Sequence, residues 1–168
     1  MTVPIVPATH ADLAAIHDLL RANRGDHSLF QQPPAQLARH LPEFLVARDA
    51  ATVVGCLQVH RHPRGSVELL AVAVHPAHHG RGVGRSLMAA GIEVARTRTS
   101  GSIWLGTAKP GYFARFGFEP MSRWALPLIV LIGKLKRVAQ QPLRRWLPAL
   151  FGRHVFMRLA AEPAVSSS

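Results

Sequence analysis

The stretch HPAHHGRGVGRSLM, from His75 to Met88, places three glycines within five positions and then passes directly into helix-forming residues. It follows VELLAVAV, Val67 to Val74, a nearly continuous apolar run that predicts a strand in the middle of a sheet. A strand that ends in a glycine-rich loop and opens a helix can bind phosphate. The first N–H groups of a helix have no partner within it, and the helix dipole adds partial positive charge. The stretch therefore predicts an anionic ligand.

The residues of this loop suit a diphosphate. Gly80, Gly82 and Gly84 lack the Cβ atoms that would hold such a group away from the backbone. Arg81 and Arg85 can add charged hydrogen bonds. Two well-known phosphate motifs do not fit, because Walker A needs a lysine where Arg85 stands and the dinucleotide motif G-x-G-x-x-G needs a glycine there. The dinucleotide motif also calls for an acid about twenty residues on, which this chain lacks.

A third pattern fits. H-P-x-x-x-G-x-G-x-G followed by an apolar helix resembles the acetyl-CoA pyrophosphate loop of the GNAT N-acetyltransferase superfamily. The usual form, Arg/Gln-x-x-Gly-x-Gly/Ala, corresponds here to His79 to Gly84, with His79 in place of arginine or glutamine. Since backbone N–H groups do most of the binding, we expect cofactor binding to survive that change. The resemblance runs in order from Ile5 to about Pro120 and includes the segments IVPATHADLAAIHDLL and YFARFGFEP.

The resemblance implies a single N-acetyltransferase domain over residues 1–160, of mixed α/β (α+β) class. Its expected architecture is a twisted, mostly antiparallel sheet flanked by helices. Such enzymes bind acetyl-CoA, and a primary amine attacks the thioester directly in a ternary complex. The resemblance assigns cofactor binding to Val72, Ala73, Val74, His79, Gly80, Arg81, Gly82, Val83, Gly84, Arg85, Ser86, Tyr112 and Phe113.

The rest of the chain predicts the other elements of a mixed α/β domain. Apolar spacing and Thr9 as N-cap indicate an amphipathic helix near the N-terminus. A hairpin is predicted next, and the glycine loop is followed by a helix with its apolar face inward. After this helix, strands and helices are predicted to alternate. The predicted elements are helices at 9–20, 36–41, 85–97 and 111–116 and strands at 43–48, 52–60, 67–74, 102–107 and 153–160.

Glu68 is the candidate general base. It is the only acid between Asp49 and Glu93, and it lies near the start of the predicted cofactor strand. The resemblance adds that the family often places a glutamate six residues before the valine that Val74 matches. Desolvation beside an apolar strand can raise the pKa of such a carboxyl toward the working pH. The alternative is an exposed glutamate at a strand end, paired with an arginine.

The family's usual general acid, a tyrosine four residues before the glycine of a Gly-Phe turn, is replaced here by Phe113. Tyr112 lies one residue earlier, and one step along a helix rotates a side chain by about 100°, so it does not inherit the role. The general acid is therefore unassigned.

The segment LGTAKPGYFARFGF resembles amino-acid acetyltransferases of the N-acetylglutamate synthase type, which acetylate the α-amine of an acidic amino acid. This favours a small anionic amine as substrate.

The composition indicates a folded domain with a strong preference for anions. The 168 residues carry a formal charge of +11, which favours a phosphorylated cofactor, an acidic substrate, nucleic acid or an anionic lipid surface. No signal peptide or membrane-spanning run is evident, so a soluble, cytoplasmic protein is expected. Cys56 is the single cysteine and is expected to be a small buried residue.

Five histidines cluster in the sequence, but we expect no metal site. No cysteine accompanies them, and sequence spacing alone does not supply convergent ligand geometry. They are interpreted as loop residues, some of them near the cofactor phosphates. The five are His60, His62, His75, His78 and His79.

Residues 121–152, before the last strand, form a basic and apolar segment that predicts an extended helical insertion, and residues 161–168 a disordered tail. The insertion is first expected to cover the substrate cleft or form a homodimer interface. Binding to an anionic membrane surface is a second possibility. Binding to RNA or DNA is the third, and no nucleic-acid-binding signature supports it. Two other functions stay open. One is a regulatory or surface-associating domain that binds acyl-CoA without turnover, suggested by Phe113 and the basic segment, and the other is a nucleic-acid-binding protein.

Overall fold

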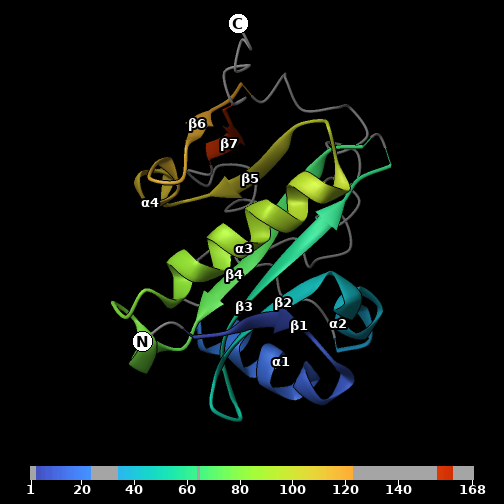
Figure 1. Cartoon of the computed structure of the whole chain (residues 1–168), viewed down its shortest axis with the longest axis vertical. Coiled ribbons are helices and arrows are strands. Elements are labelled where there is room, and N and C mark those ends of the chain that lie inside the picture. The colour runs from blue at the N-terminus through green and yellow to red at the C-terminus, as the bar shows by residue number, and fades with distance from the viewer. Residues whose placement is uncertain (1–2, 24–33, 64, 123–154, 161–168) are drawn as a thin grey trace, which may run out of the picture.

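The computed structural model describes residues 3–23, 34–63, 65–122 and 155–160. Within these ranges the chain forms a seven-stranded twisted sheet in the order β1-β2-β3-β4-β5-β7-β6 (Figure 1). Neighbouring strands are antiparallel except for β4 and β5, which are parallel. The expectation of a mixed, mostly antiparallel sheet flanked by helices is confirmed.

The elements follow the predicted order, with bounds that differ by a few residues. The strands are β1 Ile5–Pro7, β2 Phe44–Asp49, β3 Thr52–Arg61, β4 Val67–Val74, β5 Ile103–Thr107, β6 Phe118–Pro120 and β7 Val155–Leu159. The α-helices are α1 Leu13–Ala22, α2 Pro34–His40, α3 Val83–Arg98 and α4 Pro110–Ala114. Short 3-10 turns are η1 His10–Asp12, η2 Leu41–Glu43 and η3 Pro76–His78. The N-terminal helix thus begins as a 3-10 turn, and α3 starts two residues earlier than predicted.

The first helix is tied to the sheet through one buried carboxylate. The backbone N–H and the hydroxyl of Thr9 donate to Asp12 Oδ2 at 2.8 and 2.9 Å. Arg48 Nη2, from β2, donates to both carboxylate oxygens of Asp12 at 2.8 and 2.9 Å. Burial by itself raises the pKa of Asp12, but these hydrogen bonds and the Arg48 charge outweigh it and lower that pKa. The expected N-cap therefore also fixes the angle at which α1 leaves β1.

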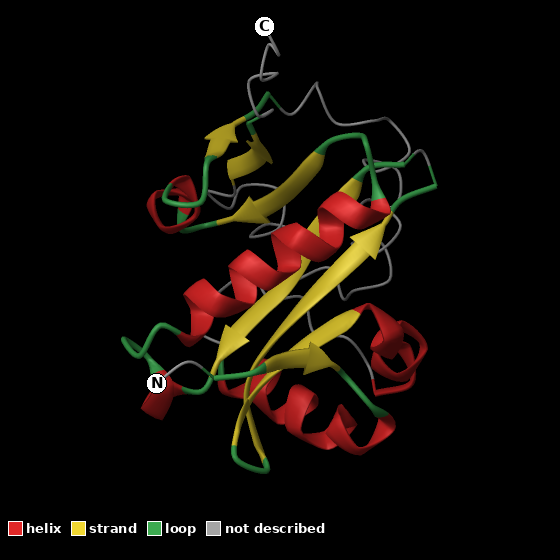
Figure 2. Cartoon of the chain, in the orientation of Figure 1, coloured by secondary structure: helices red, strands yellow, loops and turns green. Residues whose placement is uncertain are grey.

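Helices cover both faces of the sheet (Figure 2). On one face α3 buries the side chains that its periodicity directs inward, Leu87, Met88, Ile92 and Ala95. On the other face α1 and α2 pack over a second apolar cluster that includes Ile16, Leu37 and Cys56. Cys56 is buried as expected, and its desolvation raises the thiol pKa to about 12.

The central strands are irregular in the second half of β4. The register between β3 and β4 shifts between Cys56 and Gln58, and Ala71 in β4 has a φ of 50°, in the left-handed region. β4 pairs with β5 only at Val67 and Glu68. Beyond this point the two strands separate toward the glycine loop (Figure 1). The later part of β4 therefore has backbone groups that are not used by a ladder with β5.

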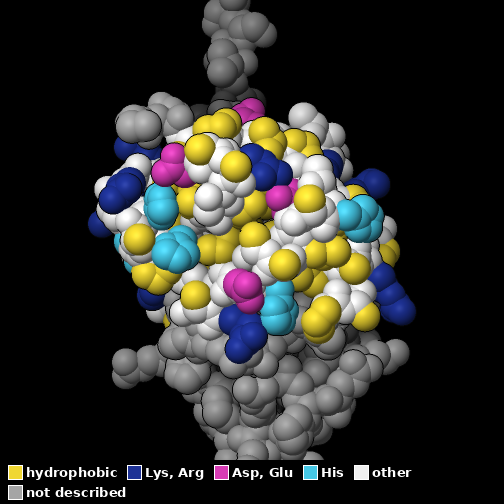
Figure 3. All heavy atoms as spheres, turned by 90° about the horizontal axis from the view of Figure 1, so that it is seen from below, with side chains coloured by type: hydrophobic (Ala, Val, Ile, Leu, Met, Phe, Trp, Pro, Cys, Tyr) yellow, Lys and Arg dark blue, Asp and Glu magenta, His cyan; other side chains and the backbone are white. Residues whose placement is uncertain are grey.

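Two sequence-based expectations, the helical insertion and the C-terminal tail, concern residues that lie almost entirely outside the described ranges. Of the predicted insertion at 121–152, only Met121 and Ser122 are among the described residues, and the tail at 161–168 lies outside them. No described helix has both the length and the hydropathy needed to cross a bilayer. Figure 3 shows one face of the molecule, where basic and histidine side chains are interspersed with apolar ones.

Candidate active site

The glycine loop turns the chain from β4 into α3 through two left-handed residues. Gly80 and Gly82 have φ values of 76° and 82°. A Cβ at either position would meet no atom within 4 Å, so glycine is favoured by backbone conformation and not by lack of space. Gly82 is the N-cap of α3, and Val83 is buried beneath the first turn. The free N–H groups of this turn form a cradle that fits a diphosphate.

Histidines hold the loop in shape. His79 Nε2 lies 2.9 Å from the carbonyl oxygen of Val74, and since a carbonyl only accepts, this nitrogen donates. His75 Nδ1 accepts from the backbone N–H of Ala77 at 3.3 Å. His78 Nε2 lies 3.2 Å from a carboxylate oxygen of Asp49, at the β2–β3 turn. These histidines lie in or beside the loop, as expected, and their contacts join it to the ends of β4 and β2.

Tyr112 and Phe113 point in different directions from α4. A Cβ added to Gly84 would lie 2.6 Å from the Tyr112 hydroxyl, so the tyrosine covers the first turn of α3. Burial raises the pKa of Tyr112, and the charge of Arg115 offsets part of that rise. Phe113 instead packs against the apolar cluster beneath α3. The tyrosine therefore lies beside the cradle, while the phenylalanine contributes to the core.

Glu68 is buried in the sheet, at the point where β4 still pairs with β5. Only 2% of the residue is exposed. Its neighbour across β3 is His60 and its neighbour across β5 is Trp104. Glu68 Oε2 lies 3.1 Å from His62 Nε2. The alternative interpretation requires an exposed glutamate that pairs with an arginine. Glu68 is instead buried, and in this contact its carboxylate faces a histidine.

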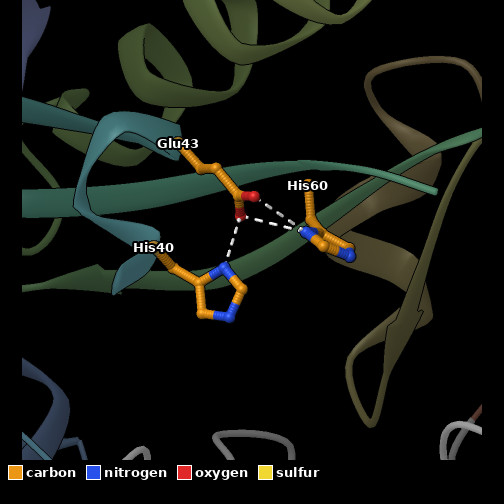
Figure 4. Close-up of side chains that lie close together, drawn as sticks. All are labelled: His40, Glu43 and His60. Carbon is orange, nitrogen blue, oxygen red and sulfur yellow. Dashed lines mark hydrogen bonds and ion pairs between the residues drawn. The ribbon is translucent and has the colours of Figure 1, made fainter. Parts of the chain in front are cut away.

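A second carboxylate, Glu43 in η2, lies between two histidines (Figure 4). His60 Nδ1 lies 3.1 and 3.0 Å from its two oxygens, and His40 Nδ1 lies 3.4 Å from Oε2. Gln58 Nε2 donates to Oε2 at 2.6 Å. Burial alone raises the pKa of Glu43, but the hydrogen bonds from His60 and Gln58 and the charges of the two histidines lower it to about 2.

The interpretation as loop residues is wrong for His60, which lies in a strand, but it holds for His62, which lies in the turn after β3. His60 lies in β3 and His62 directly follows that strand, and both face carboxylates. Gln58, His60 and His62 are spaced two residues apart, which places their side chains on one face of an extended chain. This spacing was the available signal that they lie together. The side chains of His40, Glu43 and His60 bring ligand-type atoms within 4.8 Å of one another. Their mutual hydrogen bonds and ion pairs account for this spacing without a metal. Sequence analysis did not single out His40 or Glu43.

Comparison with known proteins identifies the family. The profile of the acetyltransferase (GNAT) family matches residues 13–118, which include β2 to β5, the glycine loop and α3. The chain belongs to the GNAT acetyltransferase family. It is an acetyltransferase that uses acetyl-CoA, as the loop and the resemblance predicted.

Solved structures share the fold of this GNAT protein. Rv2747 from Mycobacterium tuberculosis, in complex with CoA, has a TM-score of 0.78 and 22% identity, with 95% of this chain and 99% of that chain covered. N-acetylglutamate synthase from Neisseria gonorrhoeae, complexed with coenzyme A and N-acetyl-glutamate, has a TM-score of 0.74 and 23% identity. That match covers 96% of this chain but only 36% of the synthase. Ard1 from Thermoplasma volcanium has a TM-score of 0.61 and 22% identity, with 73% and 86% covered.

Proposed function

We propose that this acetyltransferase acetylates the amine of an acidic amino acid or another small anionic amine, with Glu68 as the general base. The observation that carries the proposal is the arrangement of one strand, β4, which has a phosphate cradle at its C-terminal end and a buried carboxylate near its start. The likeness in fold to a synthase complexed with N-acetyl-glutamate supports the choice of substrate class. The formal charge of +11 also favours an anionic substrate.

In this proposal acetyl-CoA lies along β4. The N–H groups of the glycine loop bind the diphosphate, with the exposed side chains of Arg81 and Arg85 beside it. The backbone of residues 72–74, beyond the paired part of β4, offers hydrogen bonds to the amides of the pantetheine arm. Glu68 lies six residues before Val74, about 20 Å along an extended strand. The arm spans that distance and brings the thioester toward the carboxylate.

The reaction then needs one base and an electrophilic carbonyl. Glu68 accepts a proton from the substrate ammonium, and the freed lone pair attacks the carbonyl carbon of the thioester. The new C–N bond forms, the C–S bond breaks, and the nitrogen gives up its second proton, which passes through water to the CoA thiolate. Backbone N–H groups of β4 stabilise the negative charge that develops on the carbonyl oxygen. Phe113 leaves the family's usual acid position without a proton donor.

The test is thiol release from acetyl-CoA across a panel of amines: glutamate, aspartate, other amino acids, polyamines, aminoglycosides and a lysine peptide. We expect turnover with an acidic amino acid, and we expect Glu68→Gln to lower kcat by about 100-fold or more with CoA affinity unchanged. Glu93→Gln, an exposed carboxylate on α3, is the matched control and is expected to behave as wild type.

Each other outcome removes a different part of the proposal. Full activity of Glu68→Gln would keep the enzyme and reject Glu68 as base. Turnover confined to polyamines or the lysine peptide would reject the substrate class. CoA binding without turnover of any amine would favour the alternative of an inactive acyl-CoA-binding domain.

A further inference from the structure

A row of titratable side chains leads from the buried Glu68 to the surface. The exposed fraction of these side chains rises steadily along the row. It is 3% for Glu68, 10% for His62, 18% for His60, 26% for Glu43 and 31% for His40. The row therefore joins the proposed base to solvent through three histidines, which can bind and release a proton, and through the ionised Glu43, which lies between two of them.

Successive members of the row are in contact. Glu68 Oε2 lies 3.1 Å from His62 Nε2. The rings of His62 and His60 meet edge to face with centroids 4.8 Å apart. His60 Nδ1 lies 3.0 Å from Glu43 Oε2, and that oxygen lies 3.4 Å from His40 Nδ1 (Figure 4). Because the two rings meet edge to face, transfer between His62 and His60 requires a water molecule or rotation of one ring.

His62 is held in place from three sides. Its ring stacks on Trp104 of β5, with centroids 5.4 Å apart and an interplanar angle of 24°. Trp104 is itself fixed by a 3.4 Å hydrogen bond from its indole N–H to the hydroxyl of Ser66. Among the described residues, the titratable groups that contact the His62 ring include Glu68 from β4 and His60 from β3. The imidazole is thus oriented with one nitrogen toward the carboxylate.

The chemistry of acetyl transfer releases a proton that must reach solvent. An ammonium and a thioester yield an amide, a thiol and one free proton in each turnover. The proton first leaves the substrate nitrogen and forms an O–H bond on Glu68. A carboxyl that is 3% exposed has little direct contact with bulk water, yet it must be ionised again before the next turnover.

We propose that His62 takes this proton from Glu68 and that His60 and His40, with the ionised Glu43 between them, pass it to solvent. The O–H bond on Glu68 breaks as an N–H bond forms at His62 Nε2, and the imidazolium releases a proton toward His60. His62 is a positioning residue in this scheme, because it acts through Glu68 and not on the substrate. The inference rests on the proposed role of Glu68 as base.

The test compares His62→Gln and Glu68→Gln with wild type over about pH 5 to 8, where histidine titrates. We expect His62→Gln to lower kcat by about 10- to 100-fold while the KM values for both substrates stay within two-fold. The dependence of the wild-type kcat on pH over this range should be lost in this variant. Added imidazole should restore His62→Gln but not Glu68→Gln. His17→Gln, on α1 and outside the row, is the control.

The outcomes separate the two proposals. If Glu68→Gln is inactive and His62→Gln is as active as wild type, the relay is wrong and the base stands. A loss in His62→Gln that is equal at every pH and not rescued by imidazole means a purely structural role. Should His62→Gln fail to fold, His60→Gln tests the same row one step outward, with an expected fall of a few-fold in kcat; wild-type behaviour there overturns the inference. Full activity of Glu68→Gln removes the base and the relay together.

Discussion

At the scale of single residues, Glu43 shows how neighbours decide the ionisation of a carboxyl. Burial raises its pKa, but His60 and Gln58 lower it from 4.5 to about 2. Because the pKa of the folded state lies below that of the unfolded state, ionised Glu43 stabilises the fold at pH above 4.5. This stabilisation is lost as the pH falls from 4.5 to about 2.

The prediction concerns Glu43→Gln. We expect it to reduce the free energy of unfolding by about 1 kcal/mol at pH 7, a value discounted for solvent screening of this partly exposed group. The difference from wild type should shrink as the pH falls through 4.5 toward 2. Urea unfolding at pH 7, 5 and 3 measures it, with Glu93→Gln as the exposed control. A difference that stays constant with pH would contradict the assigned cause.

At the scale of elements, α3 approaches β3 closely because Gly91 has no side chain. A Cβ at Gly91 would overlap Leu57 Cδ2 of β3. We expect Gly91→Ala to destabilise the fold by about 1–2 kcal/mol, since overpacking outweighs the gain in helix propensity. Gly111→Ala, where a Cβ meets nothing within 4 Å, should change stability little. Thermal unfolding of both variants measures the difference, and equal melting temperatures would show that Leu57 gives way.

The contact between α1 and β2 depends on Asp12. Its side chain is 4% exposed and accepts from Thr9 and from Arg48. We expect Asp12→Ala to cost about 3 kcal/mol, because it leaves the Arg48 guanidinium and the Thr9 N–H without their acceptor. Asp18→Ala, on the same helix with a 74% exposed side chain, should stay within about 0.5 kcal/mol of wild type. Chemical denaturation compares the two, and similar losses would refute the account.

At the scale of the whole molecule, binding of acetyl-CoA should increase the free energy of unfolding. Acetyl-CoA at about 100 times its Kd adds about 2.7 kcal/mol to the free energy of unfolding, which raises Tm by about 5–10 °C. Gly82→Ala should lose most of this increase, because alanine is strained at a φ of 82° and the cradle distorts. Gly111→Ala should keep it. Scanning calorimetry with and without acetyl-CoA checks this, and a full increase in Gly82→Ala would contradict the role of the loop.

The sequence by itself determined the cofactor strand, the glycine loop and the inward face of α3. Val67–Val74 is observed with the predicted bounds, and Leu87, Met88, Ile92 and Ala95 are buried as expected. These features depend on neighbours a few residues apart: apolar periodicity, a cap, and glycines at positive φ. Such local rules can be read along the chain.

Only the tertiary structure decided how the polar side chains combine. His62 meets Glu68 because the β3–β4 hairpin has one particular register, and a shift by one residue would turn these side chains to the other face. Glu43 meets His60 because η2 lies beside β3, across 17 residues of sequence. Contacts of this kind depend on strand register and helix docking, which no local pattern specifies. Glu68, the proposed base, could therefore be singled out from sequence, while its contact with His62 could not.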